Sequence, residues 1–283
     1  MACKEYNHLL AKISSRNGEE MIFDTHAHYD DSAFDSDREE LIDSLKDSDV
    51  VAFVNVGANL KGCEDSLLLS RRYPFVYSAL GIHPSETGEL NEDNFNGLKK
   101  IISDNSIKNN GKVVAVGEIG LDYYYDDTNP DLQKIWFERQ LLMSKEVALP
   151  VIIHSRDACK DTMDLLQATD VHEGIIHCYS YSLEAAKQFV DMGFVIGIGG
   201  ALTFKNAKKL PEVVEYIPLD MIVLETDCPY MTPVPHRGER NDSRYIKYVA
   251  QRIAQIKNVS YEQVLEATFE NAKRVYGINA DIR

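Results

Sequence analysis

Short apolar runs recur along the chain from Met21 onward, and a polar segment follows each of them. The runs are rich in β-branched residues and have the length of single strands. Continuous apolar runs of this kind are typical of strands that are buried on both faces of a parallel sheet. We therefore predict strands at residues 21–24, 50–57, 75–81, 112–118, 150–154, 173–178, 194–199 and 221–227.

Helical patterns fill several of the segments between these strands. Leu41, Ile42 and Leu45 recur at helical spacing in one of them. Ser260 and Gln263 have the spacing of a capping box, which marks the start of a helix. Predicted helices cover residues 36–48, 131–147, 182–191, 205–216, 243–257 and 260–275.

The alternation of strands and helices predicts the fold class. Strands that alternate with helices over roughly 250 residues favour an α/β fold of the (β/α)8, or TIM, barrel type. The alternative is an open, doubly wound sheet, which would need a glycine-rich phosphate turn after an early strand. Neither GxGxxG nor GxxxxGK[ST] occurs in the sequence. We expect residues 21–283 to form a single barrel domain and residues 1–20 to form a polar N-terminal extension.

Composition narrows the class of protein. The 283 residues include 30 basic and 45 acidic side chains, a net charge of −15, which excludes a protein that coats nucleic acid through a basic surface. The five cysteines are odd in number and lack a CxxC pair, which is typical of reduced thiols in the cytoplasm. Because the sequence has neither an apolar run long enough to cross a bilayer nor a secretory signal, we expect a cytoplasmic protein without membrane contact.

Histidines and carboxylates gather where the predicted strands end. In a (β/α)8 barrel these ends meet at one mouth, where active sites are built. Buried imidazoles and carboxylates need partners and charge compensation, and a pair of divalent cations would supply both. The residues concerned are His26 and His28 after the first strand, His83 after the third, Glu118 at the fourth, His154 at the fifth, His177 at the sixth, and Glu225 with Asp227 at the eighth.

Taken one at a time, these residues have simpler structural explanations. A single histidine is more often a hydrogen-bonded core or surface residue than a ligand, and one HxH pair is a weak signal. The order of HxH after the first strand, Glu after the fourth, His after the fifth and sixth, and Asp after the eighth is a strong signal, and it favours a hydrolase with two divalent metal ions. Imidazole and carboxylate ligands together suit Zn, Mn or Fe, and they suit Mg where water completes the coordination sphere.

Eight sequence stretches identify a family. In these stretches the chain resembles the TatD family of metal-dependent deoxyribonucleases, within the amidohydrolase-like superfamily of barrels. One departure is Tyr181, where the family usually has glycine. The stretches run in order from Met21 to Gly277: FDTHAHYD (23–30), ALGIHP (79–84), VGEIGLDYY (116–124), VIIHSRDA (151–158), IIHCYS (175–180), TFKNAK (203–208), LETDCPYMTPVPHRGERN (224–241) and TFENAKRVYG (268–277).

The resemblance implies two metal sites that share one ligand. His26, His28, Glu118 and Asp227 would bind one divalent ion, and Glu118, His154 and His177 would bind the second. Glu118 would bridge the pair, where many barrels of the wider superfamily use a carboxylated lysine. The ions themselves are expected to be Mg, Mn or Zn.

Further residues are candidates for catalysis and substrate binding. His83 is expected to bind a substrate phosphate or a metal-bound water, and Glu225 is expected to orient a ligand histidine. Arg156 has the planar fork that suits phosphate, and Lys205 and Arg237 are expected at the entrance. Each charge has a solvated surface position as its alternative, as do Arg240 and Arg244, which are also candidates for the entrance. Residues 123–125 are tyrosines that would stack on bases or pack within a loop.

The predicted activity is hydrolysis of phosphodiester bonds in DNA by a hydroxide that two metals activate, with Asp227 orienting that hydroxide and accepting its proton. The resemblance implies a 3′ to 5′ exonuclease. The acidic surface favours short or single-stranded ends as partners, and no obligate protein partner is expected. Two alternatives remain at this stage. The same site could hydrolyse another bond, such as an aminoacyl ester on tRNA or an amide, or the protein could bind metal without catalysis.

Overall fold

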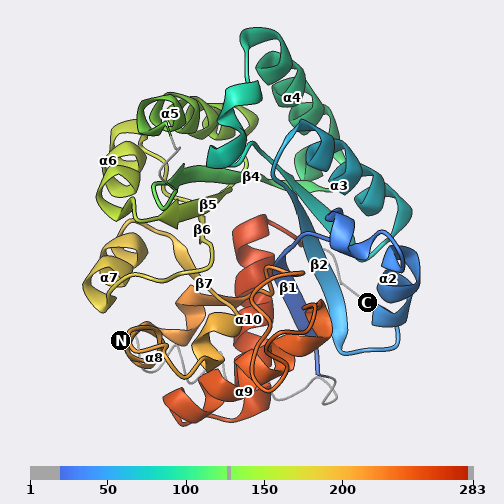
Figure 1. The fold of residues 1–283 in the computed structure, drawn as a ribbon, viewed down its shortest axis with the longest axis vertical. Helices are drawn as coiled ribbons and strands as arrows, with labels where there is room; N and C mark the ends of the chain where they lie inside the picture. The colour runs from blue at the N-terminus through green and yellow to red at the C-terminus, as the bar shows by residue number, and fades with distance from the viewer. Residues whose placement is uncertain (1–19, 126–128, 280–283) are drawn as a thin grey trace.

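The strands of the protein form one parallel barrel. The computed structural model describes residues 20–125 and 129–279, so the predicted extension at 1–20 lies almost entirely outside the described residues (Figure 1). Within these residues, neighbouring strands pair in the order β1 to β8 along the chain, and every ladder is parallel. The strands are β1 (Ile22–Ala27), β2 (Val50–Gly57), β3 (Val76–Leu80), β4 (Val113–Asp122), β5 (Val151–Arg156), β6 (Gly174–Ile176), β7 (Val195–Ile198) and β8 (Ile222–Leu224).

The predicted (β/α)8 barrel is therefore confirmed, and the doubly wound alternative is wrong. The helices surround the strands (Figure 1). Three of them, α3, α4 and α6, were not predicted from the sequence. The helices are α2 (Arg38–Leu45), α3 (Leu60–Arg72), α4 (Glu92–Asn105), α5 (Pro130–Val147), α6 (Cys159–Thr169), α7 (Leu183–Asp191), α8 (Leu210–Tyr216), α9 (Ile246–Lys257) and α10 (Tyr261–Tyr276).

Two helices show where the sequence pattern was incomplete. The buried face of α3 includes Gly62, Ser66 and Ser70, so a search for large apolar residues at helical spacing does not find it. Helix α8 begins at Leu210 rather than at residue 205, with Pro211 in its first turn. Proline suits this position because the first N–H groups of a helix have no intrahelical partner.

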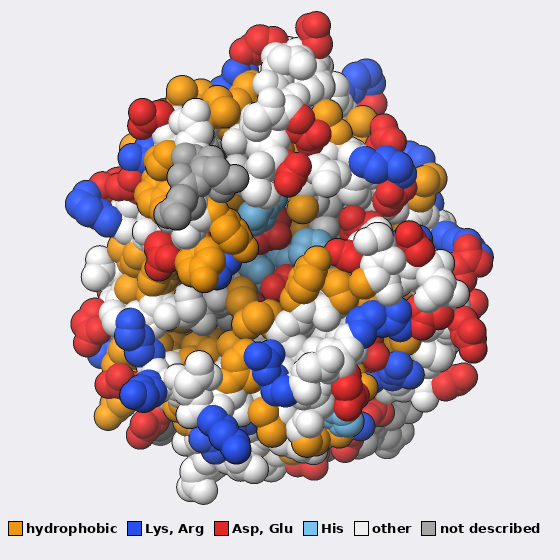
Figure 2. All heavy atoms as spheres, in the orientation of Figure 1, with side chains coloured by type: hydrophobic (Ala, Val, Ile, Leu, Met, Phe, Trp, Pro, Cys, Tyr) orange, Lys and Arg blue, Asp and Glu red, His pale blue; other side chains and the backbone are white. Residues whose placement is uncertain are grey.

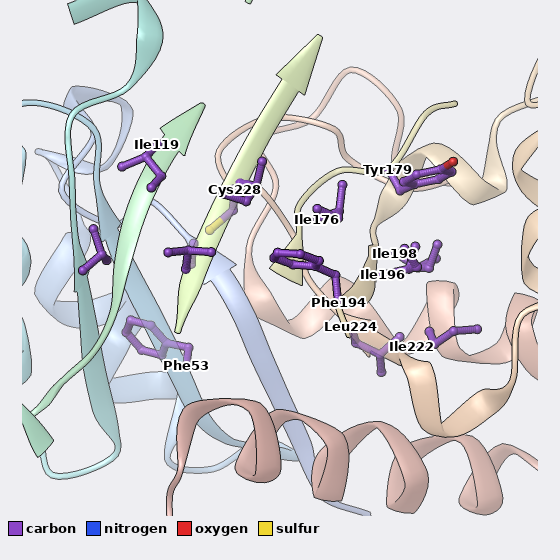
Figure 3. Packing of buried hydrophobic residues seen from close by; sticks show 14 of the residues in the cluster. Phe53, Ile119, Ile176, Tyr179, Phe194, Ile196, Ile198, Ile222, Leu224 and Cys228 are labelled. Carbon is purple, nitrogen blue, oxygen red and sulfur yellow. The ribbon is translucent and has the colours of Figure 1, made fainter. Parts of the chain in front are cut away.

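Alternate residues of each strand belong to two apolar clusters. Phe53, Ile176 and Leu224 belong to the larger cluster, part of which Figure 3 shows. Their neighbours in sequence, such as Val54 and Val223, belong to the second cluster, together with residues of α10. This alternation follows from the pleat of a strand, and burial on both faces explains why the runs are continuously apolar.

The seam between β1 and β8 is held by buried side chains as well as by backbone contacts. Thr25 Oγ1 donates to the carbonyl of Leu224, 2.9 Å away. The Asp24 carboxylate accepts from Thr226 N at 3.0 Å and from Thr226 Oγ1 at 2.6 Å, and Ser243 Oγ donates to it at 2.7 Å. Since a buried carboxylate is stable only with such partners, Asp24 fixes the segment after β8 against β1.

In the described parts of the chain, no helix is both long enough and apolar enough to cross a membrane.

We expect Asp24→Ala to lower the free energy of unfolding by roughly 3 kcal/mol, because the substitution leaves several buried donors without an acceptor. Urea denaturation followed by circular dichroism measures this loss. Asp47→Ala is the matched control, since Asp47 is exposed and its substitution should change stability by less than about 0.5 kcal/mol. Equal midpoints for the two variants would contradict the role of Asp24 in the seam.

Candidate metal centre

The carboxyl ends of the strands carry a cluster of imidazoles and carboxylates. Figure 2 shows histidine and acidic side chains at the bottom of a hollow in this face, with hydrophobic side chains around it. The cluster forms because the barrel brings the carboxyl ends of all its strands to one mouth. The structure places six predicted ligands here: His26 in β1, His28 directly after it, Glu118 in β4, His154 in β5, His177 directly after β6, and Asp227 after β8.

The first half of the cluster consists of the HxH pair with Glu118 and Asp227. His26 Nε2 and His28 Nε2 are 3.0 Å apart. Both nitrogens lie 3.5 to 3.9 Å from Glu118 Oε2 and Asp227 Oδ1. A cation with bonds of about 2.1 Å holds neighbouring ligand atoms roughly 3.0–3.4 Å apart. The separations seen here are close to those between neighbouring ligand atoms around such a cation.

The second half of the cluster lies on the other oxygen of Glu118. His154 Nδ1 is 2.8 Å from Glu118 Oε1, and His177 Nε2 is 3.6 Å from the same oxygen. The ligand atoms of Glu118, His154 and His177 all lie within 4.8 Å of one another. Each oxygen of Glu118 therefore faces a different pair of imidazoles.

Hydrogen bonds behind two of the histidines fix which nitrogen faces the centre. His28 Nδ1 lies 2.8 Å from the carbonyl of Val56, and His177 Nδ1 lies 3.0 Å from Glu225 Oε2. These oxygens can only accept, so each Nδ1 carries the proton, and a neutral ring directs the lone pair of Nε2 inward. Lone pairs that face carboxylate oxygens need a cation between them, so the donor set fits a metal.

The electrostatics of the centre show the same demand for positive charge. Burial opposes ionisation of Glu118, but His177 and His26 outweigh it and hold the pKa of Glu118 well below its usual value. Burial lowers the pKa of His28, yet Asp227 and Glu118 raise it to about 9. On His177 burial is likewise outweighed, by Glu225, Glu118 and Asp227, and the pKa rises to about 10. Bound metal would take the place of these imidazole protons.

Asp122 is a further carboxylate that the sequence analysis missed. It is the last residue of β4, and its Oδ2 lies 3.0 Å from His154 Nε2. His154 therefore has a carboxylate at each ring nitrogen. A signal was present in the sequence, because Glu118 and Asp122 are four residues apart in one strand and so point to the same side of it.

His83 presents a hydrogen rather than a lone pair to the centre. Its Nδ1 accepts from the backbone N–H of Ser85 at 3.2 Å, so the proton of the neutral ring is on Nε2. Burial lowers the pKa of His83 to about 4, which favours the neutral ring. Nε2 is 3.9 Å from Glu118 Oε1. This tautomer suits a donor to an oxygen atom more than a metal ligand.

Glu225 lies behind the centre and acts on it through His177. It is fully buried and accepts from His177 Nδ1 at 3.0 Å and from the backbone N–H of Cys178 at 2.7 Å. Gly197 makes room for this carboxylate, because a Cβ atom there would lie 2.4 Å from Glu225 Oε2. A carboxylate with this contact can orient a metal-binding imidazole, which is the role that the sequence predicts for Glu225.

The predicted substrate residues differ in their surroundings. Arg156 ends β5, with its guanidinium 3.5 Å from the ring centroid of Tyr124, and Arg237 lies 3.9 Å from that of Phe204. Lys205 follows the short helical turn after β7. Arg240 and Arg244 differ from these, because both are paired with carboxylates, those of Asp37 and Asp242 respectively.

Tyr181, the departure from the family pattern, has a structural role at the end of β5. Its hydroxyl lies 2.9 Å from Ser155 Oγ and accepts from the backbone N–H of Ala158 at 3.1 Å. The side chain therefore supports the turn between β5 and α6, and within the described residues no hydrogen bond joins it to a predicted metal ligand.

Known proteins resemble this chain over nearly its whole length. The family model described as TatD related DNase matches residues 23–277. An uncharacterized metal-dependent hydrolase of Bacillus subtilis, YabD, is 41% identical over 261 residues, which cover 92% of this chain and 100% of that protein. A second uncharacterized metal-dependent hydrolase, YcfH of Escherichia coli K12, is 33% identical and covers 92% of this chain and 97% of its own length.

A solved structure shows the same architecture. YjjV, a TatD homolog from Escherichia coli K12, superposes with a TM-score of 0.85 at 29% identity, over 91% of this chain and 98% of that one. The family model spans nearly the whole barrel, and the two relatives above are similar over nearly their full lengths. The chain therefore belongs to the TatD-related family of metal-dependent hydrolases.

Proposed function

We propose that the protein hydrolyses phosphodiester bonds of DNA, as a cytoplasmic 3′ to 5′ exonuclease that acts on single strands or on strand ends. The observation that carries the proposal is that the two carboxylate oxygens of Glu118 face different pairs of imidazoles. One of its oxygens faces His26 and His28, at 3.5 and 3.7 Å, and the other faces His154 and His177, at 2.8 and 3.6 Å. A carboxylate in this position suits two divalent ions, which we expect to be Mg, Mn or Zn.

When bound, such a pair of cations neutralises charge on the phosphate and lowers the pKa of the attacking water. The residues of the chain do the remaining work. Asp227 is the carboxylate that a substrate can reach, because its side chain is 20% exposed and that of Glu118 is only 5% exposed. Asp227 is thus placed to orient the attacking water and to accept its proton through a carboxylate oxygen.

His83 and Arg156 supply donors for the substrate. His83 Nε2 lies 3.9 Å from Glu118 Oε1, so its N–H is near enough to the centre to donate to a phosphate oxygen there. The Arg156 guanidinium is two residues beyond His154 in β5 and can bind a second oxygen. Both donors would stabilise charge that grows on phosphate oxygens during the reaction.

The net charge limits which nucleic acids can bind. A charge of −15 repels a long duplex, so capture of phosphate must occur within the mouth. Short single strands and frayed ends bring few phosphates against the acidic surface. This supports a preference for ends over internal duplex sites.

The direct test is digestion of oligodeoxynucleotides labelled at the 3′ or the 5′ end, with added Mn²⁺ or Mg²⁺. We expect early loss of the 3′ label from single strands and slow attack on closed-circular duplex. Aminoacyl-tRNA and small amides are assayed beside them. Turnover of one of these without turnover of DNA would replace the nuclease proposal with hydrolysis of that bond, and no turnover of any substrate would favour a protein that binds metal without catalysis.

We expect Glu118→Gln to reduce kcat at least about a hundredfold, because an amide cannot provide two anionic oxygens to the two halves of the centre. Elemental analysis of the purified variant should show that metal is lost, while circular dichroism shows an intact barrel. Glu212→Gln, an exposed residue of α8, is the control and should retain both metal and activity. Full activity with unchanged metal content in Glu118→Gln would rule out its bridging role.

We expect Glu225→Gln to weaken metal affinity by roughly 10- to 100-fold while leaving the ligands in place. The cause is that a neutral amide does not fix the proton of His177 on Nδ1 as a carboxylate does. Activity titrated against Mn²⁺ should shift to higher concentration and recover in large part at saturation. An unchanged titration curve would show that Glu225 supports only the packing of the barrel.

A further inference from the structure

Arg156, at the end of β5, differs from several other arginines of the protein. Arg72, Arg139, Arg240 and Arg244 each pair with a carboxylate. Arg156, by contrast, lies over an aromatic ring, and within the described residues its guanidinium has neither a hydrogen bond nor an ion pair. Among the acidic side chains of residues 20–125 and 129–279, none pairs with Arg156, so its donors are not used by that part of the chain and can bind an external anion.

The aromatic ring under Arg156 holds the guanidinium without occupying its donors. Arg156 Cζ is 3.5 Å from the ring centroid of Tyr124 and 5.5 Å from that of Tyr125. A guanidinium that stacks on an aromatic face is attracted through its flat surface, so the N–H groups at its edge stay free. A phosphate can therefore bind at this edge in the bidentate manner that is specific to arginine.

Tyr124 is anchored to the metal centre and is still largely open to solvent. Its backbone N–H donates to Asp122 Oδ1 at 3.0 Å, and the other oxygen of Asp122 contacts His154. The Tyr124 side chain is 55% exposed although Arg156 covers one of its faces. The ring therefore offers its second face to another flat group, directly beside the centre.

Neighbouring Tyr123 shows what a tyrosine with a packing role looks like in the same loop. Its hydroxyl donates to Asp161 at 3.0 Å, and the ring belongs to the residues packed against the core. Within the described part of the chain, Tyr124 has neither feature. The contrast separates a tyrosine that holds the loop in place from one whose ring is open to solvent.

We propose that Tyr124 and Arg156 form a subsite for one unpaired nucleotide next to the scissile phosphate, in which the guanidinium binds a phosphate and the Tyr124 ring stacks on the base. This inference rests on the proposed function, and it names the feature of the substrate that the mouth recognises. A base inside a duplex has neighbours on both faces and must be unstacked before it can bind, at a cost of a few kcal/mol. A terminal or unpaired base is free to stack, which gives a physical reason for a preference for ends.

The test compares short single strands that differ only by removal of the base at the 3′ end or at the 5′ end. Binding of labelled strands whose phosphorothioate linkages resist hydrolysis is measured by fluorescence anisotropy with Mn²⁺ present, so that the metal centre is loaded and the strands stay intact. The wild type should bind the complete strand more tightly than one of the two abasic strands. Stacking on an aromatic ring accounts for roughly 5- to 150-fold in affinity.

Variants assign this preference to the two residues. Tyr124→Ala should bind complete and abasic strands equally, whereas Tyr124→Phe should keep the preference because it keeps the ring. Arg156→Ala should weaken complete and abasic strands by the same factor. Matched controls are Tyr216→Ala, which removes a tyrosine that is 60% exposed on α8, and Arg252→Ala, which removes an exposed arginine on α9. Both controls should bind as the wild type does.

Two results would overturn the subsite: equal binding of complete and abasic strands by the wild type, or a preference that persists in Tyr124→Ala. Hydrolysis with Mn²⁺, measured separately, distinguishes this failure from a failure of the proposed function. A preference for the base without cleavage of DNA would support the nucleotide subsite and refute the nuclease. Cleavage without any preference for the base would support the nuclease and refute the subsite.

Discussion

The carboxylate of Glu118 is the constraint on which the rest of the site depends. It is buried among imidazoles, and its two oxygens face two different pairs of them. A charged group in such a place is stable only if positive charge surrounds it. Protons on the histidines supply that charge in the protein alone, and divalent ions supply more of it. The contacts that stabilise the buried, ionised Glu118 thus also define a site for cations.

Residues that do not touch the centre keep this arrangement in place. Glu225 fixes the tautomer of His177, and the carbonyl of Val56 does the same for His28. Asp24 joins β1 to the segment after β8, so that His26 and Asp227 meet across the seam of the barrel. Stability and function therefore overlap at the seam, where three ligands of one half of the centre come from the ends of β1 and β8, which are far apart in sequence.

Much of the fold and of the candidate site followed from the sequence, because parallel strands in a barrel all end at the same mouth. The order of polar residues after apolar runs was enough to predict that six side chains, distant in sequence, lie close together. Asp122 was missed because strand β4 continues beyond Glu118, although the two-residue periodicity of a strand already placed both residues on one side. Helix α3 was missed because small residues form much of its buried face.

Other features could not be read from the sequence because they depend on partners from distant segments. The sequence alone does not distinguish Arg240 from Arg156. The fold shows that Arg240 pairs with Asp37, whereas Arg156 lies over the ring of Tyr124. The tautomer of His83 likewise depends on a backbone N–H in the following turn. Such pairings decide which charges are available to a substrate, and they are set by tertiary structure.

The central claim is that the six side chains at the mouth bind two divalent ions around Glu118. Crystals grown with Mn²⁺ and measured above the manganese absorption edge test it most directly through the anomalous difference map. The account predicts two peaks, one among His26, His28 and Asp227 and one between His154 and His177, each beside a different oxygen of Glu118. A map without peaks at the mouth, or with ions bound only elsewhere on the protein, would contradict it.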